Sequence, residues 1–170
     1  FTPDAVFAQC RNAYFSYWSD RIRGEKKSLI PSSSGNEDQY PAYFTSLRWK
    51  NNGFTFTGDV YSHIAWAFAR APKFFDIVGY TGNMVGGVYT WRLIPHNLKT
   101  YPQLIIIKKR GSTTAEWYIW GQGMASQQRL MFTTAAAFMD TTIWDQARTT
   151  DSVFCVGSSA YVNESSMQYI

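Results

Sequence analysis

Short apolar runs, separated by polar and turn-forming residues, recur along the whole chain. Residues 104–107 form a continuous aliphatic run, which is the pattern of a strand buried on both faces. Residues 14–18 and 116–120 are short aromatic runs, and these favour strands. Helical periodicity is weak, and only residues 135–139 allow one or two helical turns. About twelve short strands without helices between them predict an all-β fold, either a β-sandwich or a jelly roll.

Apolar blocks from the first part of the chain recur in the same order in the last part. Residues 3–11 match residues 102–110, from a proline to an arginine, at an offset of about 99 residues. The later matches are 14–18 with 116–120, 26–30 with 127–131, Trp49 with Trp144, 54–58 with 153–157, and 64–67 with 167–170. This series predicts an internal duplication within one domain over residues 1–170, with a first copy at 2–71 and a second at 101–170.

Residues 73–100 have no counterpart in either copy and are expected to connect the two. Residues 74–80 and 88–93 predict two strands around a glycine-rich loop, so we expect a hairpin connector. Residues 51–53, Asn-Asn-Gly, predict another hairpin turn because Asn and Gly tolerate positive φ. The chain has no initiator methionine, and the second copy stops inside its last strand. We therefore expect a fragment of a longer polypeptide.

Composition adds an expectation about the surface. Hydrophobic residues make up 45%, which fits a packed protein, but charged residues make up only 16%. With 18% aromatic residues, part of the aromatic surface is expected to meet a partner or a ligand, unless the aromatic core is large. The net charge of +4 has no dense basic cluster, and no apolar stretch has the length of a membrane span. We therefore expect neither nucleic-acid binding nor membrane insertion.

The two cysteines, Cys10 and Cys155, are too few for a disulfide framework. Cys155 lies in an apolar run and is expected to be a small core residue. A reducing compartment during assembly fits this cysteine usage better than a Cys10–Cys155 bridge does.

Motifs for catalysis or metal binding are missing from the sequence. There is no Gly-x-Ser-x-Gly, and a triad would have to use one of only two histidines. We expect His96 to hydrogen-bond nearby backbone, and His63 to be structural or on the surface. Asp140 with Asp145, and the run 36–38, are the best Ca²⁺ candidates, but solvated carboxylates explain them more simply. We therefore expect no catalytic residue, no metal site and no cofactor.

Aromatic rings remain as candidates for binding, because sugars stack their apolar faces on exposed Trp and Tyr. Tyr89 and Trp91 have no counterpart in the other copy, so they are the candidate carbohydrate-binding residues. Other tryptophans are paired by the repeat, which favours core packing: Trp18 with Trp120, and Trp49 with Trp144.

Several motifs follow one another in a fixed order. They are IAWAF at 64–68, FFDIV at 74–78, YTG at 80–82, HNL at 96–98, the hydrophobic strand 104–108 ending in lysine, WYIW at 117–120 and SVFCVG at 152–157. Together they resemble an internally duplicated, lectin-like β domain found in tail-fibre and structural proteins of marine tailed bacteriophages. That family usually has Gly directly after HNL, where this chain has Lys99.

The resemblance implies a concanavalin-like sandwich and a structural role in the virion, which is assembled in the host cytoplasm. It implies a non-enzymatic tail-fibre or receptor-binding domain for host attachment, with cell-surface glycans as its expected ligands. The expected partners are other virion proteins and further copies of the chain, a homo-oligomer such as a trimer. Two alternatives stay open. One is a capsid decoration or head-fibre protein that contacts other virion proteins, and the other is a glycan depolymerase.

Overall fold

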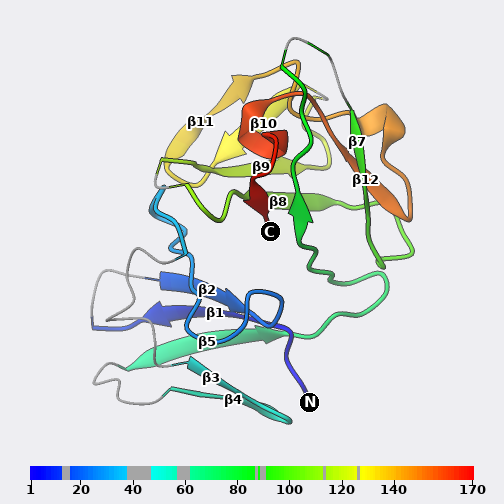
Figure 1. Ribbon diagram of the computed structural model, residues 1–170. Coiled ribbons are helices and arrows are strands. Elements are labelled where there is room, and N and C mark those ends of the chain that lie inside the picture. Colours follow the sequence, from blue (N-terminus) through cyan, green and yellow to red (C-terminus); the bar gives the residue numbers. More distant parts are fainter. Residues whose placement is uncertain are drawn as a thin grey trace.

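The computed structural model describes residues 1–12, 16–37, 47–56, 62–86, 88, 91–112, 114–125 and 127–170. Strands and loops make up almost all of this part of the chain, and every strand pair is antiparallel, so the predicted all-β sandwich fold is confirmed. The strands form two groups, one above the other in Figure 1. We call these groups the N-terminal half, within residues 1–71, and the C-terminal half, within residues 80–170.

The N-terminal half is a three-stranded sheet with a hairpin packed on one face (Figure 1). Its strands are β1 (Ala5–Cys10), β2 (Ser16–Asp20), β3 (Leu47–Lys50), β4 (Gly53–Phe56) and β5 (His63–Phe68). β1 lies in the centre of the sheet, between β2 and β5, and β3 with β4 forms the hairpin. The predicted turn at residues 51–53 is confirmed, since Lys50 pairs with Gly53. Val6 and Ala8 of β1 are fully buried against the hairpin.

The C-terminal half contains a four-stranded sheet, two strand pairs and two short helices. Its elements are β6 (Tyr80–Thr81), β7 (Arg92–Pro95), β8 (Leu104–Lys108), β9 (Trp117–Gly121), β10 (Gln128–Met131), β11 (Thr134–Met139), the 3₁₀ helix η1 (Gln146–Arg148), β12 (Val153–Val156), α2 (Ala160–Asn163) and β13 (Gln168–Tyr169). The sheet order is β11-β10-β9-β8, and β12 pairs with β7 as β13 pairs with β6. A second hydrophobic core, which includes Ile107, Trp120 and Trp144, fills this half.

The two halves share one pattern of pairing. In the first half, β1 lies between β2 and β5. In the second half, β8 has β9 on one side, and on its other side a bridge between Lys109 and Tyr169 joins it to the end of the chain. The next segment along the chain also corresponds in the two halves. In the first half Leu29 forms a bridge to Trp18 of β2, and in the second half Leu130 of β10 pairs with Ile119 of β9. An internal duplication predicts this correspondence. The residue limits of the two copies stay a prediction.

The connector differs from the expected hairpin. β6 pairs with β13 and β7 pairs with β12, so neither strand of the connector pairs with the other. Residues 74–78 form a turn and an irregular segment rather than a strand. Pairing with strands near the end of the chain places Tyr80 and Ile94 in the C-terminal core, where they are buried. The free energy gained by burying these apolar side chains is larger than the free energy that a local hairpin would provide.

Two local details bear on the motifs. Residues 135–139 belong to β11 rather than to helical turns, because ladder hydrogen bonds to β10 override the helix propensity of alanine. Lys99 has φ of 55°, in the left-handed region that favours glycine. A residue other than Gly after the HNL motif therefore occupies a strained backbone position.

In the described ranges no helix has both the length and the apolar character needed to cross a membrane.

Candidate functional site

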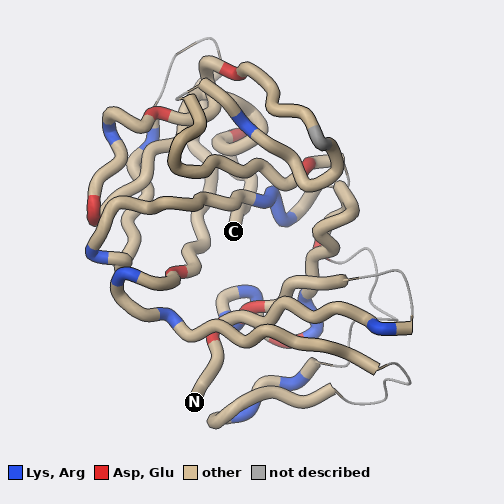
Figure 2. Tube along the Cα trace, turned by 180° about the vertical axis from the view of Figure 1, so that it is seen from behind, with Lys and Arg blue, Asp and Glu red and all other residues tan. Residues whose placement is uncertain are grey.

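A cleft of about 690 Å³ lies between the two halves. One wall is the face of the β2-β1-β5 sheet that points away from the β3–β4 hairpin, and the opposite wall is formed mainly by β8. Residues 74–78 of the connector and the C-terminal Ile170 also line it. In both Figure 1 and Figure 2 the C-terminus lies between the halves. The volume falls in the range that is typical of small-ligand sites.

Aromatic side chains form the wall on the N-terminal half. Side chains alternate along a strand, so Phe7 faces the cleft while its neighbours in β1 face the hairpin. Trp18 lies with its ring 5.8 Å from Phe68 and 6.2 Å from Phe75, and the two phenylalanines are 5.3 Å apart. Phe7 in turn stacks on Trp66 at 5.5 Å. These contacts hold the rings in place as a preformed surface.

Aliphatic side chains of β8 form the opposite wall. Ile107 is 1% exposed in the C-terminal core, whereas Leu104 is 59% exposed and Ile106 39% exposed on the cleft side. The prediction that this run is buried on both faces was therefore wrong. Only one face of β8 is covered by the core, and the other faces the open cleft.

His96 is one of the polar residues that line the cleft. The backbone N–H of Leu98 donates to its Nδ1 at 3.2 Å, so the predicted hydrogen bond to nearby backbone is confirmed. An acceptor Nδ1 places the ring proton on Nε2. The residue is 6% exposed, its ring stacks on Phe154, and Nε2 has no partner within the described residues. A buried N–H donor without a partner costs free energy.

Asp76 supplies a carboxylate to the same cleft. Its Oδ2 accepts the backbone N–H of Asn97 at 2.7 Å, and its Oδ1 accepts that of Ile77 at 2.9 Å. Each oxygen retains a further lone pair, because an ionised carboxylate has about four acceptor positions. Ser16 and Ser32 line the cleft as well. The cleft therefore combines a largely apolar lining with a few groups able to form hydrogen bonds.

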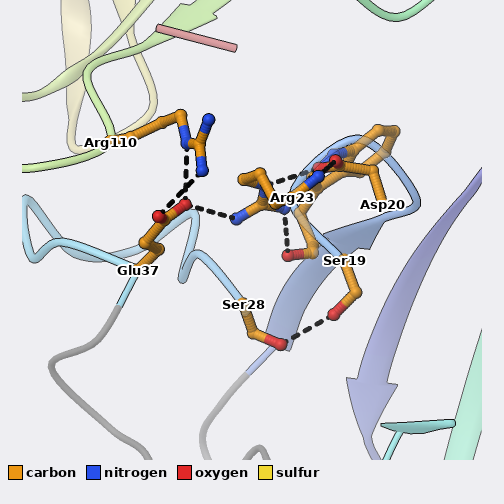
Figure 3. A network of polar contacts seen from close by, with 7 residues as sticks. Ser19, Asp20, Arg23, Ser28, Glu37 and Arg110 are labelled. Carbon is orange, nitrogen blue, oxygen red and sulfur yellow. Dashed lines mark hydrogen bonds and ion pairs between the residues drawn. The ribbon is translucent and has the colours of Figure 1, made fainter. Parts of the chain in front are cut away.

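A polar joint fastens the two halves beside the cleft (Figure 3). Arg110 of the C-terminal half donates to both carboxylate oxygens of Glu37, at 2.9 and 3.0 Å. Glu37 also lies 4.0 Å from the guanidinium of Arg23, which is bound to Asp20 at 2.5 Å. Burial lowers the pKa of Arg23, and the adjacent Asp20 opposes that shift. The joint thus places two arginines around one carboxylate.

Lys108 adds a second connection at the same place. Its side chain is fully buried, and its Nζ donates to the backbone oxygens of Ser34, at 2.8 Å, and Ala115. Burial lowers the pKa of Lys108 to about 8. The indole N–H of Trp117 donates to the backbone oxygen of Ile30 at 3.0 Å. Residues 30–37 therefore tie the first half to β8 and β9.

Trp91 is the one member of the sequence-predicted sugar site that the structure describes. Tyr89 falls outside the described residues. Trp91 is partly buried, with the Arg148 guanidinium 5.8 Å from its ring centre, and it is not among the residues that line the cleft. The carbohydrate-binding role of both residues stays a prediction.

The tryptophans paired by the repeat have different environments. Trp120 and Trp144 are buried in the C-terminal core, and Trp49 is partly buried against the N-terminal core. Trp18 instead lines the cleft, together with Phe75, Asp76 and His96, which the sequence did not identify as binding residues. The only sequence feature that sets Phe75, Asp76 and His96 apart is their position in connector motifs outside the repeat.

The Ca²⁺ candidates are engaged in other contacts. Asp140 accepts from Thr142 and lies 3.4 Å from Arg129, and Asp145 pairs with Arg148 at 2.6 Å. Asp38 falls outside the described residues. No group of three or more His, Cys, Asp or Glu residues gathers in the part of the chain that the structure describes.

Both cysteines are buried free thiols. Cys155 packs in the C-terminal half as predicted, and burial raises the pKa of its thiol to about 11. A raised thiol pKa suppresses the reactive thiolate.

Comparison with known proteins gives one match. A family model described as a domain of unknown function, DUF7483, matches residues 57–170, which is more than half of the chain and includes β5, the connector and the whole C-terminal half. No curated protein and no solved structure matches the chain. The chain therefore belongs to the DUF7483 family.

Proposed function

We propose that the chain is a non-enzymatic structural domain of a bacteriophage virion that attaches the particle to its host by binding a cell-surface glycan. The cleft between the two halves carries the proposal. It places Trp18, Phe68 and Phe75 on one wall and Asp76 in the same space. Aromatic faces combined with a few oriented polar groups are the usual means by which a protein holds a sugar.

The phage origin rests on the sequence motifs described above. Several of them line the cleft: Phe75 and Asp76 belong to FFDIV, and His96 and Leu98 to HNL. The motifs that carry the resemblance therefore coincide with the candidate site. This coincidence supports a binding role for the site in the same setting.

The arrangement of carboxylates favours binding over hydrolysis. Glycoside hydrolysis uses two carboxyl groups on either side of the scissile bond. Among the described lining residues of the cleft, Asp76 is the only one with a carboxylate side chain. Glu37, Asp140 and Asp145 are each paired with arginine. A depolymerase is for this reason the weaker alternative.

Exposed apolar side chains favour assembly with other proteins as a second part of the role. Val85, Val88 and Leu93 are each more than half exposed, and so is Met139 at the far edge of the four-stranded sheet. Positively and negatively charged residues are scattered over the described parts of both halves (Figure 2). Such a surface suits contact with further copies, as in a trimer, or with other virion proteins. It also supports the alternative of a capsid decoration or head-fibre protein.

Binding of the labelled chain to cells tests the proposal. We expect saturable binding to some members of a panel of marine bacteria, and loss of that binding after periodate oxidation of surface glycans. Absence of binding across the panel, together with labelling of virion heads by an antibody against the chain, would replace attachment by the decoration role.

A further inference from the structure

We infer that the outer edge of β5 pairs with β5 of a second copy of the chain, as antiparallel strands related by a two-fold axis. The β2-β1-β5 sheets of the two copies then form one continuous sheet. This inference goes beyond the proposed function and does not depend on what the cleft binds. Its support comes from a comparison of the sheet edges, from the backbone pattern of β5 and from its exposed side chains.

Within the described residues, the other outer edges of the two main sheets are covered or interrupted. The end of the chain covers β8, since Lys108 and Ile170 exchange two backbone hydrogen bonds. Leu29 covers β2 in the same way, through two backbone hydrogen bonds with Trp18. β11 is interrupted by a register shift in its pairing with β10, and such irregularities hinder further pairing. β5 instead pairs with β1 in unbroken register, and no described strand lies on its other side.

The backbone of β5 offers hydrogen-bonding groups to a further strand. Bonding groups alternate between the two sides of an antiparallel strand. The N–H of Arg11 donates to the backbone oxygen of Ser62 at 2.8 Å, and this bond continues the register of β1 with β5. By this alternation the N–H and C=O groups of Ala65 and Ala67 point away from β1. An edge of this kind is a template for another strand.

The sequence of β5 is complementary to itself. When Ala65 of one copy faces Ala67 of the second, the outward N–H and C=O groups of both strands meet. The same register places Trp66 opposite Trp66 of the second copy. Side chains lie closest together at such a pair, and aromatic pairs there stabilise a sheet. Residues 60–69 contain no charged side chain, so a second copy brings no like charges face to face.

Exposed apolar side chains on β5 would be covered by this pairing. Ile64 is 46% exposed and Trp66 is 48% exposed, on the face of the sheet that also carries the cleft residue Phe68. The ring of Trp66 already stacks on Phe7 at 5.5 Å, which holds it in place. Pairing places Ile64 opposite Phe68 of the second copy and removes apolar surface from water. A two-fold axis perpendicular to the sheet keeps both clefts on one face, so the dimer can engage two ligands on one surface.

Sedimentation equilibrium of the intact chain tests the inference. We expect a reversible monomer–dimer equilibrium between about 1 µM and about 0.2 mM, because one pair of strands buries less area than a standard interface. A chain that stays monomeric throughout this range, or that forms a trimer, overturns the inference.

Two substitutions at Ala65 test the backbone pairing. Ala65→Pro removes the outward N–H but leaves the bonds to β1, since an edge strand tolerates proline where its N–H faces outward. The dissociation constant of the dimer is expected to rise at least about tenfold. Ala65→Val is the matched control, because it keeps the N–H, and should change this constant by less than about threefold. Thermal unfolding checks that both variants are folded. An unchanged dissociation constant in folded Ala65→Pro overturns the inference.

A side-chain variant keeps the test decisive if proline disturbs the strand. Trp66→Lys leaves the backbone intact and places two like charges opposite each other across the two-fold axis, so the dimer should be lost. Phe74→Lys is the control, since Phe74 is 70% exposed and lies outside β5, and its dimer should persist. A dimer that survives Trp66→Lys, or that Phe74→Lys weakens equally, overturns the inference.

Discussion

Arg110 donates two hydrogen bonds to the Glu37 carboxylate, at 2.9 and 3.0 Å, across the boundary between the two halves. Both side chains are less than one-fifth exposed. Because the pair is largely removed from water, deletion of one partner leaves the other charge poorly compensated. The joint is therefore expected to contribute more to stability than the surface ion pairs do.

Arg110→Gln should lower the free energy of unfolding by about 2–3 kcal/mol, measured by urea denaturation. Arg70→Gln is the matched control, since Arg70 pairs with Asp4 at 3.1 Å but is 48% exposed, and its loss should stay below about 1 kcal/mol. Similar losses in the two variants would contradict a stabilising joint.

The buried Lys108 gives a prediction about pH. Its folded pKa of about 8 lies below the ordinary value of 10.5, so the unfolded chain binds more protons between these two values. Stability from this group therefore rises as the pH increases from about 8. Cys155 acts in the opposite direction above pH 9, because its folded pKa is raised to about 11. The effect of Lys108 is clearest between pH 8 and 9.

Lys108→Met keeps most of the length of the side chain and removes the titrating group. The free energy of unfolding of the parent chain, relative to this variant, should increase by roughly 1 kcal/mol from pH 8 to pH 9. Urea unfolding at closely spaced pH values measures this difference. Parallel pH profiles for the two proteins would show that Lys108 does not titrate in this window.

Ile106 and Ile107 are neighbours on opposite faces of β8. Ile107→Ala should cost about 3 kcal/mol, since Ile107 is 1% exposed in the C-terminal core. Ile106→Ala should cost less than about 1 kcal/mol, since Ile106 is 39% exposed in the cleft. Chemical denaturation of both variants checks this contrast. Equal losses would mean that the cleft face is covered in solution.

Gly157, the last residue of the SVFCVG motif, has no room for a side chain. A methyl group there would overlap the backbone oxygen of Thr142 and lie 2.9 Å from the Trp91 ring. Gly157→Ala should therefore lower stability by about 3 kcal/mol, because the backbone must move. Gly111→Ala is the control, with open space around the added methyl, and should change stability by less than about 0.5 kcal/mol. Melting temperatures that fall equally would contradict the steric explanation.

Local sequence patterns predicted several elements well. The Asn-Asn-Gly turn, the strand at 104–107 and the backbone contact of His96 all depend on neighbouring residues, and all three are present. Pairing between distant segments was harder to predict. β6 and β7 pair with strands near the end of the chain, and no local pattern marks such partners. The expected hairpin connector was wrong for this reason.

The candidate site could not be predicted from the sequence for the same reason, because it is formed by segments that are far apart in the chain. Four successive aliphatic residues in β8 do not indicate whether a second layer covers their outer face. The sequence around Trp18 likewise does not indicate whether its ring faces a core or a cleft. The unpartnered Nε2–H of His96 depends on three-dimensional neighbours, Phe154 and Leu98, and so is visible only in the structure.

Each half has a hydrophobic core of its own, and the hydrogen bonds and ion pairs that join the halves involve residues 30–37. These contacts are largely removed from water, so salt screens them little. The two halves are therefore separately packed bodies, and one short segment of the first half carries the polar connection between them.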